Sequence, residues 1–258
     1  GTNTYISNHL ALSAPAYGTT AKHLYQKFLN HSDNKMDVEL CLTKMADPSQ
    51  DYLDTPEDVE ALVDELIADH DTRVIIFNVA MVDYKPTYLQ EWRTEDKTLG
   101  EDVNIFGKYR RRISTTGTPV IDLELKPYDK IINKIRKERK DILLVGFKTT
   151  CGSTKEEQFH KGLKLCKDSS ANIVFVNDVD KNRINNLNNL LKEKENLESI
   201  LPLQHSISIN LSTIEKEIQA LQNNGLVTPE ESSYWYNTRD EALDALVQMV
   251  LDRSHLTY

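Results

Sequence analysis

The sequence predicts an α/β protein with a mostly parallel sheet and helices on both faces. Three continuous apolar runs carry this prediction: residues 73–80 (RVIIFNVA), 141–147 (DILLVGF) and 171–177 (ANIVFVN). Such runs are typical of strands buried on both faces, as in a parallel sheet. Helical patterns at 127–139 and 154–167 separate the runs along the chain. Buried strands that alternate with helices form right-handed βαβ units, which gives the fold class.

Two helices and one strand are expected before the first apolar run. Residues 19–31 carry apolar side chains at helical spacing, and residues 37–43 (DVELCLT) alternate as a half-buried strand does. Thr55 stands before a proline and two acids, which is typical of a helix start. We expect the helix that begins there to run through Ile67.

The stretch from 85 to 125 interrupts the alternation of strands and helices. It contains prolines and glycines, a basic run at 108–112 (KYRRR), and a β-rich segment at 120–125 that predicts a strand. A loop this long inside a compact domain is usually functional or a contact arm. We therefore expect a flap or dimerisation arm here.

The last part of the chain combines an insertion with a terminal helix. Residues 181–235 are rich in Asn, Leu, Lys and Glu. They contain helical patterns around 184–191 and at 212–221, the second with a capping box. Thr238 is expected to cap a final helix at 239–252. We expect residues 1–258 to form a single domain that carries 181–235 as an insertion.

The composition excludes several classes of protein. The 258 residues are 39% hydrophobic and 28% charged, which is typical of a globular chain. No apolar run of about 18 residues occurs, so neither a transmembrane helix nor a membrane partner is expected. A formal net charge of −9 argues against a non-specific nucleic-acid binder. Three widely spaced cysteines form neither a disulfide framework nor a zinc pattern, so we expect a cytoplasmic protein.

Ligands of open α/β sheets bind outside the carboxyl ends of the strands. That rule selects residues 78–86, with Asp83 as their single acid, then residues 147–152, and then Asn177-Asp178. Each also has a structural interpretation: Asp83 as a turn residue, and Asn177-Asp178 as a helix cap. The arginine run could be a charged strand edge. The convergence of several such segments at one edge favours a ligand site.

Five segments, in order, resemble motifs of the phosphopantothenate–cysteine ligase (phosphopantothenoylcysteine synthetase) family. They are YISNH (5–9), RVIIFNVAMVDYKP (73–86), RIST (112–115), LVGFK (144–148) and NIVFVNDV (172–179). No single motif is specific, but the set is, and it covers roughly residues 1–180. The DYKP and LVGFK versions look more like the stand-alone synthetases than the fused bacterial enzyme.

The resemblance implies a Rossmann-like sheet in a homodimer whose arm packs across the interface. It also implies a two-step reaction on small-molecule substrates. The carboxylate of 4′-phosphopantothenate attacks the α-phosphorus of CTP or ATP, and the amine of cysteine then attacks the resulting acyl-nucleotide. Mg²⁺ accompanies the triphosphate. Because charge builds on phosphate and acyl oxygens, amide donors and cations matter more than a covalent nucleophile.

The resemblance also implies roles for individual residues. Asn8 matches the asparagine that contacts the pantothenate carboxylate and the acyl intermediate, and Arg112 falls where the family has a flap lysine that serves the second step. Asp83 matches the acid that binds the pantothenate moiety, next to the backbone of Val79 and Ala80. The residues expected around the nucleotide are Phe147, Lys148, Asn177 and Asp178. No protein ligand to a metal is expected.

The chain departs from the family pattern at four places. The loop after Asn8, residues 10–18, is longer and lacks the first glycine of the family's loop. Thr4 stands where the family has an arginine that reaches the neighbouring subunit's substrate. Arg112 replaces a lysine, which is not an equivalent cation. The family's first strand would precede residue 1, so the sequence leaves its presence open.

Three functional hypotheses follow from these observations. The first is an active ligase of coenzyme A synthesis, which the retained Asn8 and Asp83 favour. The second is a repurposed or inactive homologue that binds a nucleotide or a partner, which Thr4, Arg112 and the altered loop favour. The third is a Rossmann-type oxidoreductase, which is the weakest because no G-x-G-x-x-G follows a strand.

Overall fold

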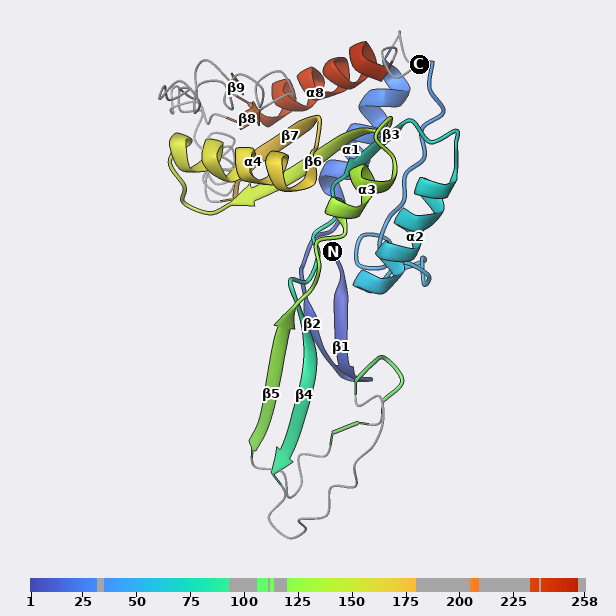
Figure 1. Cartoon of the computed structure of the whole chain (residues 1–258), viewed down its shortest axis with the longest axis vertical. Helices are drawn as coiled ribbons and strands as arrows, with labels where there is room; N and C mark the ends of the chain where they lie inside the picture. Colours follow the sequence, from blue (N-terminus) through green and yellow to red (C-terminus); the bar gives the residue numbers. More distant parts are fainter. Residues whose placement is uncertain are drawn as a thin grey trace, which may run out of the picture. The chain divides into compact units, whose positions relative to one another are not determined.

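The structure is a computed structural model. It describes residues 1–31, 35–92, 106–110, 112–113, 120–179, 205–208, 233–236 and 238–254. The chain divides into two compact units that are discontinuous in sequence (Figure 1). The first comprises residues 1–22, 39–65 and 79–130, and the second comprises residues 23–38, 66–78 and 131–258. The prediction of a single domain stays a prediction.

A five-stranded sheet forms the centre of the second unit, in the order β3-β6-β7-β8-β9. Its parallel part comprises β3 (Val74–Phe77), β6 (Leu143–Thr150) and β7 (Ile173–Asp178). The strands β8 (His205–Ser208) and β9 (Ser233–Tyr236) extend it in antiparallel fashion. All three apolar runs thus become adjacent parallel strands, which confirms the predicted α/β fold class.

Helices cover both faces of this sheet because its strands alternate their side chains. On one face Val145 and Phe175 pack with buried residues of α1 (Thr19–Asn30) and α8 (Arg239–Ser254). The other face carries α3 (Ile132–Glu138) and α4 (Lys155–Ser169). A Cβ at Gly146 would lie 3.3 Å from Ile132 Cδ1 and 3.4 Å from Leu165 Cδ2. Gly146 therefore lets α3 and α4 approach the sheet closely.

The predicted helix starts are confirmed in detail. Thr55 Oγ1 accepts a hydrogen bond of 3.2 Å from the Asp58 N–H at the start of α2 (Pro56–Ala68), and the Asp58 carboxylate accepts the Thr55 N–H at 2.8 Å. Thr238 caps α8 in the same way through the Glu241 N–H at 3.2 Å. The expected helices around 184–191 and 212–221 lie outside the described residues. None of the described helices combines the length and the apolar composition that a membrane-spanning helix requires.

The first unit is built from two separate antiparallel pairs of strands. One is the hairpin of β1 (Asn3–Ser7) and β2 (Leu10–Ser13), and the other pairs β4 (Tyr84–Trp92) with β5 (Val120–Pro127). The strand expected at 120–125 is thus confirmed, whereas β4 was not predicted. Pro86 argued against a strand in the sequence, because proline cannot donate a hydrogen bond to a ladder. In the structure the register of β4 and β5 shifts between Pro86 and Tyr88.

Two strand predictions need correction. Residues 37–43 form no strand, although exposed and half-buried positions alternate over residues 37–40. A strand needs a neighbouring ladder, and the part of the chain that the structure describes supplies none for this segment. The strand expected over 73–80 ends at Phe77, because the Asn78 N–H bonds back to the Ile76 carbonyl at 3.1 Å in a turn.

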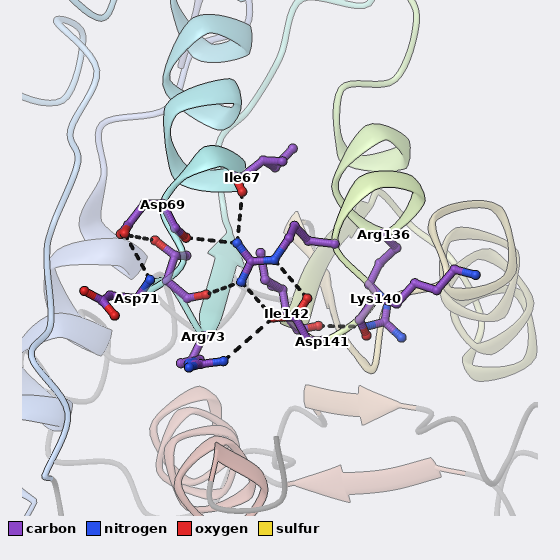
Figure 2. Close-up of polar contacts among 10 residues, drawn as sticks. Ile67, Asp69, Asp71, Arg73, Arg136, Lys140, Asp141 and Ile142 are labelled. Carbon is purple, nitrogen blue, oxygen red and sulfur yellow. Dashed lines mark hydrogen bonds and ion pairs between the residues drawn. The ribbon is translucent and has the colours of Figure 1, made fainter. Parts of the chain in front are cut away.

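Polar contacts join the loop after α2 to the loop before β6, near the amino ends of β3 and β6, and Figure 2 labels Ile67, Asp69 and Asp141 among the residues involved. The guanidinium of Arg139 donates to the carbonyls of Ile67 and Asp69 at 2.9 Å and of Thr72 at 3.1 Å. It also binds both carboxylate oxygens of Asp141, at 2.9 and 2.7 Å. Arg139 therefore donates hydrogen bonds to carbonyls that have no partner within α2 at the end of this helix. It lies at the edge of the sheet opposite the carboxyl ends of the strands.

Candidate functional site

Asn8 lies in the tight turn between β1 and β2. Its side chain is exposed, and its Oδ1 lies 2.9 Å from His9 Nδ1. Its backbone N–H donates to the carbonyl of Arg110 at 3.1 Å, so the turn lies against the basic run. The amide of Asn8 is thus presented on the surface by a backbone that is itself fixed.

The same contact brings the segment with Arg112 beside the Asn8 turn. The neighbouring Ile113 is buried, and it packs with Ile6 of β1 in a small apolar cluster. Arg112 itself is exposed. The structure therefore brings the two predicted catalytic residues onto neighbouring segments of one unit, an exposed amide on one and an exposed cation on the other.

Asp83 begins the ribbon of β4 and β5, in the same unit as Asn8. Its side chain is 63% exposed and pairs with Lys130. Its carbonyl accepts the Tyr128 N–H at 2.9 Å. The Asp83 carboxylate is thus open to solvent on a fixed backbone.

Val79 and Ala80 run beside the start of the chain. The Ala80 carbonyl accepts the Thr2 N–H at 3.0 Å, and Thr2 Oγ1 accepts the Val82 N–H at 3.0 Å. The backbone of this segment is therefore partly used within the protein. No motif in the sequence pointed to Thr2, because a single threonine carries no recognisable pattern.

Thr4, the residue that departs from the motif pattern noted in the sequence, occupies a buried position. It is 5% exposed, and its hydroxyl donates to the Tyr128 hydroxyl at 3.4 Å. Tyr128 in turn donates to Glu57 Oε1 at 2.9 Å. Burial raises the pKa of Tyr128 to about 12, with Glu57 acting in the same direction, so the phenol stays protonated at neutral pH. Thr4 is thus part of a polar chain inside the unit.

In the second unit, the predicted nucleotide residues lie at the carboxyl ends of β6 and β7. The register pairs Thr149 with Asn177 and Thr150 with Asp178. The structure therefore brings the two strand ends together, as the rule for α/β sheets predicts. Lys148 is half-buried and comes just before these pairs.

Phe147 faces the α1 and α8 side of the sheet. Its ring stacks on Phe175 with centroids 5.0 Å apart, and it packs against the main apolar cluster. Asn177 is half-buried, and its Oδ1 accepts a long hydrogen bond of 3.5 Å from Thr149. Phe147 therefore contributes to the core as well as to the strand end.

Asp178 is 3% exposed, and both its carboxylate oxygens bond within the protein. One accepts the Thr150 hydroxyl at 2.7 Å and the Ser153 N–H at 3.0 Å, and the other accepts the Gly152 N–H at 3.1 Å. Gly152 adopts a φ of 61°, which favours glycine. Asp178 thus shapes the loop from β6 to α4.

The predicted segment 147–152 includes Thr150 and Gly152, which bond to Asp178, but the prediction missed Ser153 and Thr154. The loop ends in a capping box in which Thr154 Oγ1 accepts the Glu157 N–H at 3.2 Å and Glu157 accepts the Thr154 N–H at 2.8 Å. The pattern Ser-Thr-x-x-Glu after a strand carried that signal. The described residues contain no group of three or more His, Cys, Asp or Glu that could hold a metal ion.

No family model matches the sequence, and no curated protein matches it. Solved structures do match. The DNA/pantothenate metabolism flavoprotein from Streptococcus pneumoniae superposes with a TM-score of 0.64 at 19% identity, over 98% of this chain and 95% of that chain. The C-terminal domain of the coenzyme A biosynthesis bifunctional protein CoaBC gives 0.54 at 12% identity, over 98% and 91%.

A third similar structure is a variant of Cab2 in complex with phosphopantothenate-cysteine. Its TM-score is 0.55 at 10% identity, over 100% of this chain and 84% of that chain. At these identities the likeness concerns the fold, which agrees with the resemblance seen in the sequence motifs. The chain therefore has the Rossmann-like α/β fold of these pantothenate and coenzyme A proteins.

Proposed function

We propose that this protein joins 4′-phosphopantothenate to cysteine through an acyl-nucleotide, with CTP or ATP as co-substrate. The observation that carries the proposal is the hydrogen bond of 3.1 Å from the Asn8 N–H to the Arg110 carbonyl. It places an exposed amide and the segment of an exposed arginine side by side, and the reaction needs both kinds of group. The fold of proteins named for pantothenate and coenzyme A supports the same substrate class.

In the first step, a carboxylate oxygen of 4′-phosphopantothenate forms a bond to the α-phosphorus of the nucleotide, and the bond to the bridging oxygen of pyrophosphate breaks. Asn8 donates its amide to the other carboxylate oxygen and so orients the attack. Asp83 accepts hydrogen bonds from the pantothenate moiety beside Val79 and Ala80. Orientation of this kind lowers the barrier without a covalent nucleophile.

In the second step, the amine of cysteine forms a bond to the acyl carbon, and CMP or AMP leaves with the former carboxylate oxygen. The amine releases its proton to solvent during this step. Negative charge develops on the acyl oxygen and on the leaving phosphate, where the Asn8 amide and the Arg112 guanidinium stabilise it. A guanidinium suits this role because it stays charged and binds phosphate in a fork.

The carboxyl ends of β6 and β7 form the proposed nucleotide subsite. Lys148 offers a charge for phosphate, while Phe147 and Asn177 shape the strand ends. Asp178 contributes by holding the loop before α4, since its own oxygens are engaged. A Mg²⁺ ion brought by the triphosphate would neutralise part of the phosphate charge, and Lys148 would add to that neutralisation.

The test is pyrophosphate release with 4′-phosphopantothenate, Mg²⁺ and either CTP or ATP, measured with and without cysteine. We expect release that depends on 4′-phosphopantothenate with one nucleotide, and 4′-phosphopantothenoylcysteine when cysteine is present. Folded protein that releases no pyrophosphate with either nucleotide would refute the proposal. The result would favour the homologue that binds without turnover.

A further inference from the structure

An ion-pair cluster lies in the first unit, beside the segment that carries Arg112. Its centre is Asp54, whose side chain is 2% exposed. The Asp54 carboxylate accepts hydrogen bonds from Asn3 Nδ2 at 2.7 Å and from the Tyr5 hydroxyl at 2.8 Å. Lys108 lies 3.5 Å from this carboxylate and 3.5 Å from that of Asp51. Residues from β1, the 51–54 segment and the basic run therefore meet in one cluster.

The charges in this cluster stabilise one another. Burial by itself would raise the pKa of Asp54, but the hydrogen bonds from Asn3 and Tyr5 and the charge of Lys108 lower it. Burial also opposes the charge of Lys108, yet the two carboxylates raise its pKa. Both groups are therefore charged at neutral pH, and the ammonium also lies 6.0 Å from the centre of the Tyr5 ring.

Lys108 connects this cluster to the proposed catalytic groups. The turn that contains it is closed by the Arg110 N–H, which donates to the Gly107 carbonyl at 3.2 Å. The Arg110 carbonyl at the end of that turn accepts the Asn8 N–H. Lys108 is thus two residues from the contact with Asn8 and four from Arg112.

We propose that Lys108 is a positioning residue that fixes the segment of Arg112 against the Asn8 turn by pairing with Asp54 and Asp51. The inference rests on the proposed function and deepens it, because it assigns a residue to the second step. Lys108 touches no reacting atom. It acts through Arg112, and its loss should affect cysteine transfer more than activation of the carboxylate.

The experiment compares Lys108→Met with Arg112→Ala and with the double variant. Pyrophosphate release without cysteine and transfer to cysteine are measured separately. We expect Lys108→Met to slow cysteine transfer about fivefold, the size expected for a partly exposed ion pair, and to leave pyrophosphate release within about twofold. In the Arg112→Ala background the same substitution should have no further effect, since groups that act as a unit are non-additive.

The chain offers a matched control and a conservative rescue. Lys44 also pairs with Asp51, at 2.5 Å, but it lies outside the basic run. Lys44→Met should therefore leave cysteine transfer unchanged, while Lys108→Arg should restore it to within about twofold, because a guanidinium also forms charge-assisted hydrogen bonds to carboxylates. Equal losses in Lys44→Met and Lys108→Met, or independent effects of Lys108 and Arg112, would overturn the assignment.

Hydrogen exchange at the backbone N–H of Asn8 provides a readout that needs no turnover. If Lys108 fixes the segment, that amide exchanges about fivefold faster in Lys108→Met, because its bond to the Arg110 carbonyl opens more often. An unchanged rate would refute the positioning role even in an active enzyme. Faster exchange in a protein without pyrophosphate release would support the anchoring and locate the failure in the proposed reaction.

Discussion

The predicted site residues of the two units differ in how far the protein uses their side chains. Asn8, Asp83 and Arg112 in the first unit are exposed, and the backbone around Asn8 and Asp83 is held by hydrogen bonds. In the second unit Phe147 stacks in the core and Asp178 is buried with both oxygens engaged. The first set is available to a ligand, whereas much of the second set builds the strand ends on which a ligand could rest.

This difference shows that the position of a residue relative to a strand does not by itself determine whether its side chain is free to bind a ligand. Asp83 and Asp178 each follow or end a buried apolar run, so the same rule selects both. Asp83 is 63% exposed on its side chain, while Asp178 as a residue is 3% exposed and accepts three hydrogen bonds. The sequence position of a polar residue after a buried strand thus predicts where the residue lies in the fold. Its hydrogen-bond partners decide whether its side chain can bind a ligand.

The contrast is tested most strongly by Asp178→Ala. It leaves the Gly152 and Ser153 N–H groups and the Thr150 hydroxyl without their acceptor, which should lower the free energy of unfolding by about 3 kcal/mol. Urea unfolding measures this. The adjacent Asn177→Ala serves as control and should change stability by no more than about 0.5 kcal/mol. Equal unfolding midpoints for the two variants would contradict the structural role of Asp178.

Asn8→Asp should give the opposite result, lost activity in a stable protein. The substitution removes an amide donor and brings a negative charge toward a negative substrate, so product formation should fall by about 100-fold. The side chain is exposed, so the midpoint of thermal unfolding should stay the same. Full turnover in this variant would show that the Asn8 assignment is wrong.

Asp83→Ala should raise the KM for 4′-phosphopantothenate by about tenfold, the value of one charged hydrogen bond. Stability should change by no more than about 0.5 kcal/mol, because the ion pair with Lys130 is exposed. Lys130→Met breaks the same pair and keeps the carboxylate, so its KM should stay near that of the wild type. If both variants raised KM alike, the pair rather than Asp83 would be responsible.

Asp141 in the second unit provides the smallest effect, and it depends on pH. The hydrogen bonds from Arg139 lower the pKa of Asp141 to about 2, although partial burial acts in the opposite direction. A carboxylate whose pKa is lowered in the folded state stabilises the fold at pH values above its ordinary pKa near 4. That contribution is lost as the pH falls toward 2. The stability difference between wild type and Asp141→Asn, from urea unfolding, should be constant above pH 5 and shrink between pH 4 and 2. A difference independent of pH would contradict the paired carboxylate.

The sequence predicted the second unit better than the first. Its apolar runs at 141–147 and 171–177 admit few alternatives, because strands buried on both faces carry that signature. The first unit depends on polar pairings between distant segments, such as Thr2 with Ala80 and Lys108 with Asp54. No periodicity encodes such pairs, so β4 was missed and 37–43 was wrongly predicted as a strand.

The roles of the candidate site residues stay predictions, and only their positions can be compared with the structure. The motifs selected Asn8 and Arg112, and the structure places their segments together. The motifs could not reveal that Asp178 binds its own loop or that Lys108 pairs with a buried carboxylate. Both depend on hydrogen-bond or ion-pair partners 25 or more positions away in the chain, which only the folded structure brings together.

The acyl-nucleotide is tested most directly by following a labelled oxygen. The protein is incubated with cysteine, the accepted nucleotide and 4′-phosphopantothenate that carries ¹⁸O in its carboxylate. The masses of the phosphate-containing products are then measured by mass spectrometry. The proposed mechanism predicts ¹⁸O in the phosphate of CMP or AMP and unlabelled pyrophosphate. Label in inorganic phosphate, released together with CDP or ADP, would contradict the mechanism, because it would mean that an acyl phosphate had formed instead.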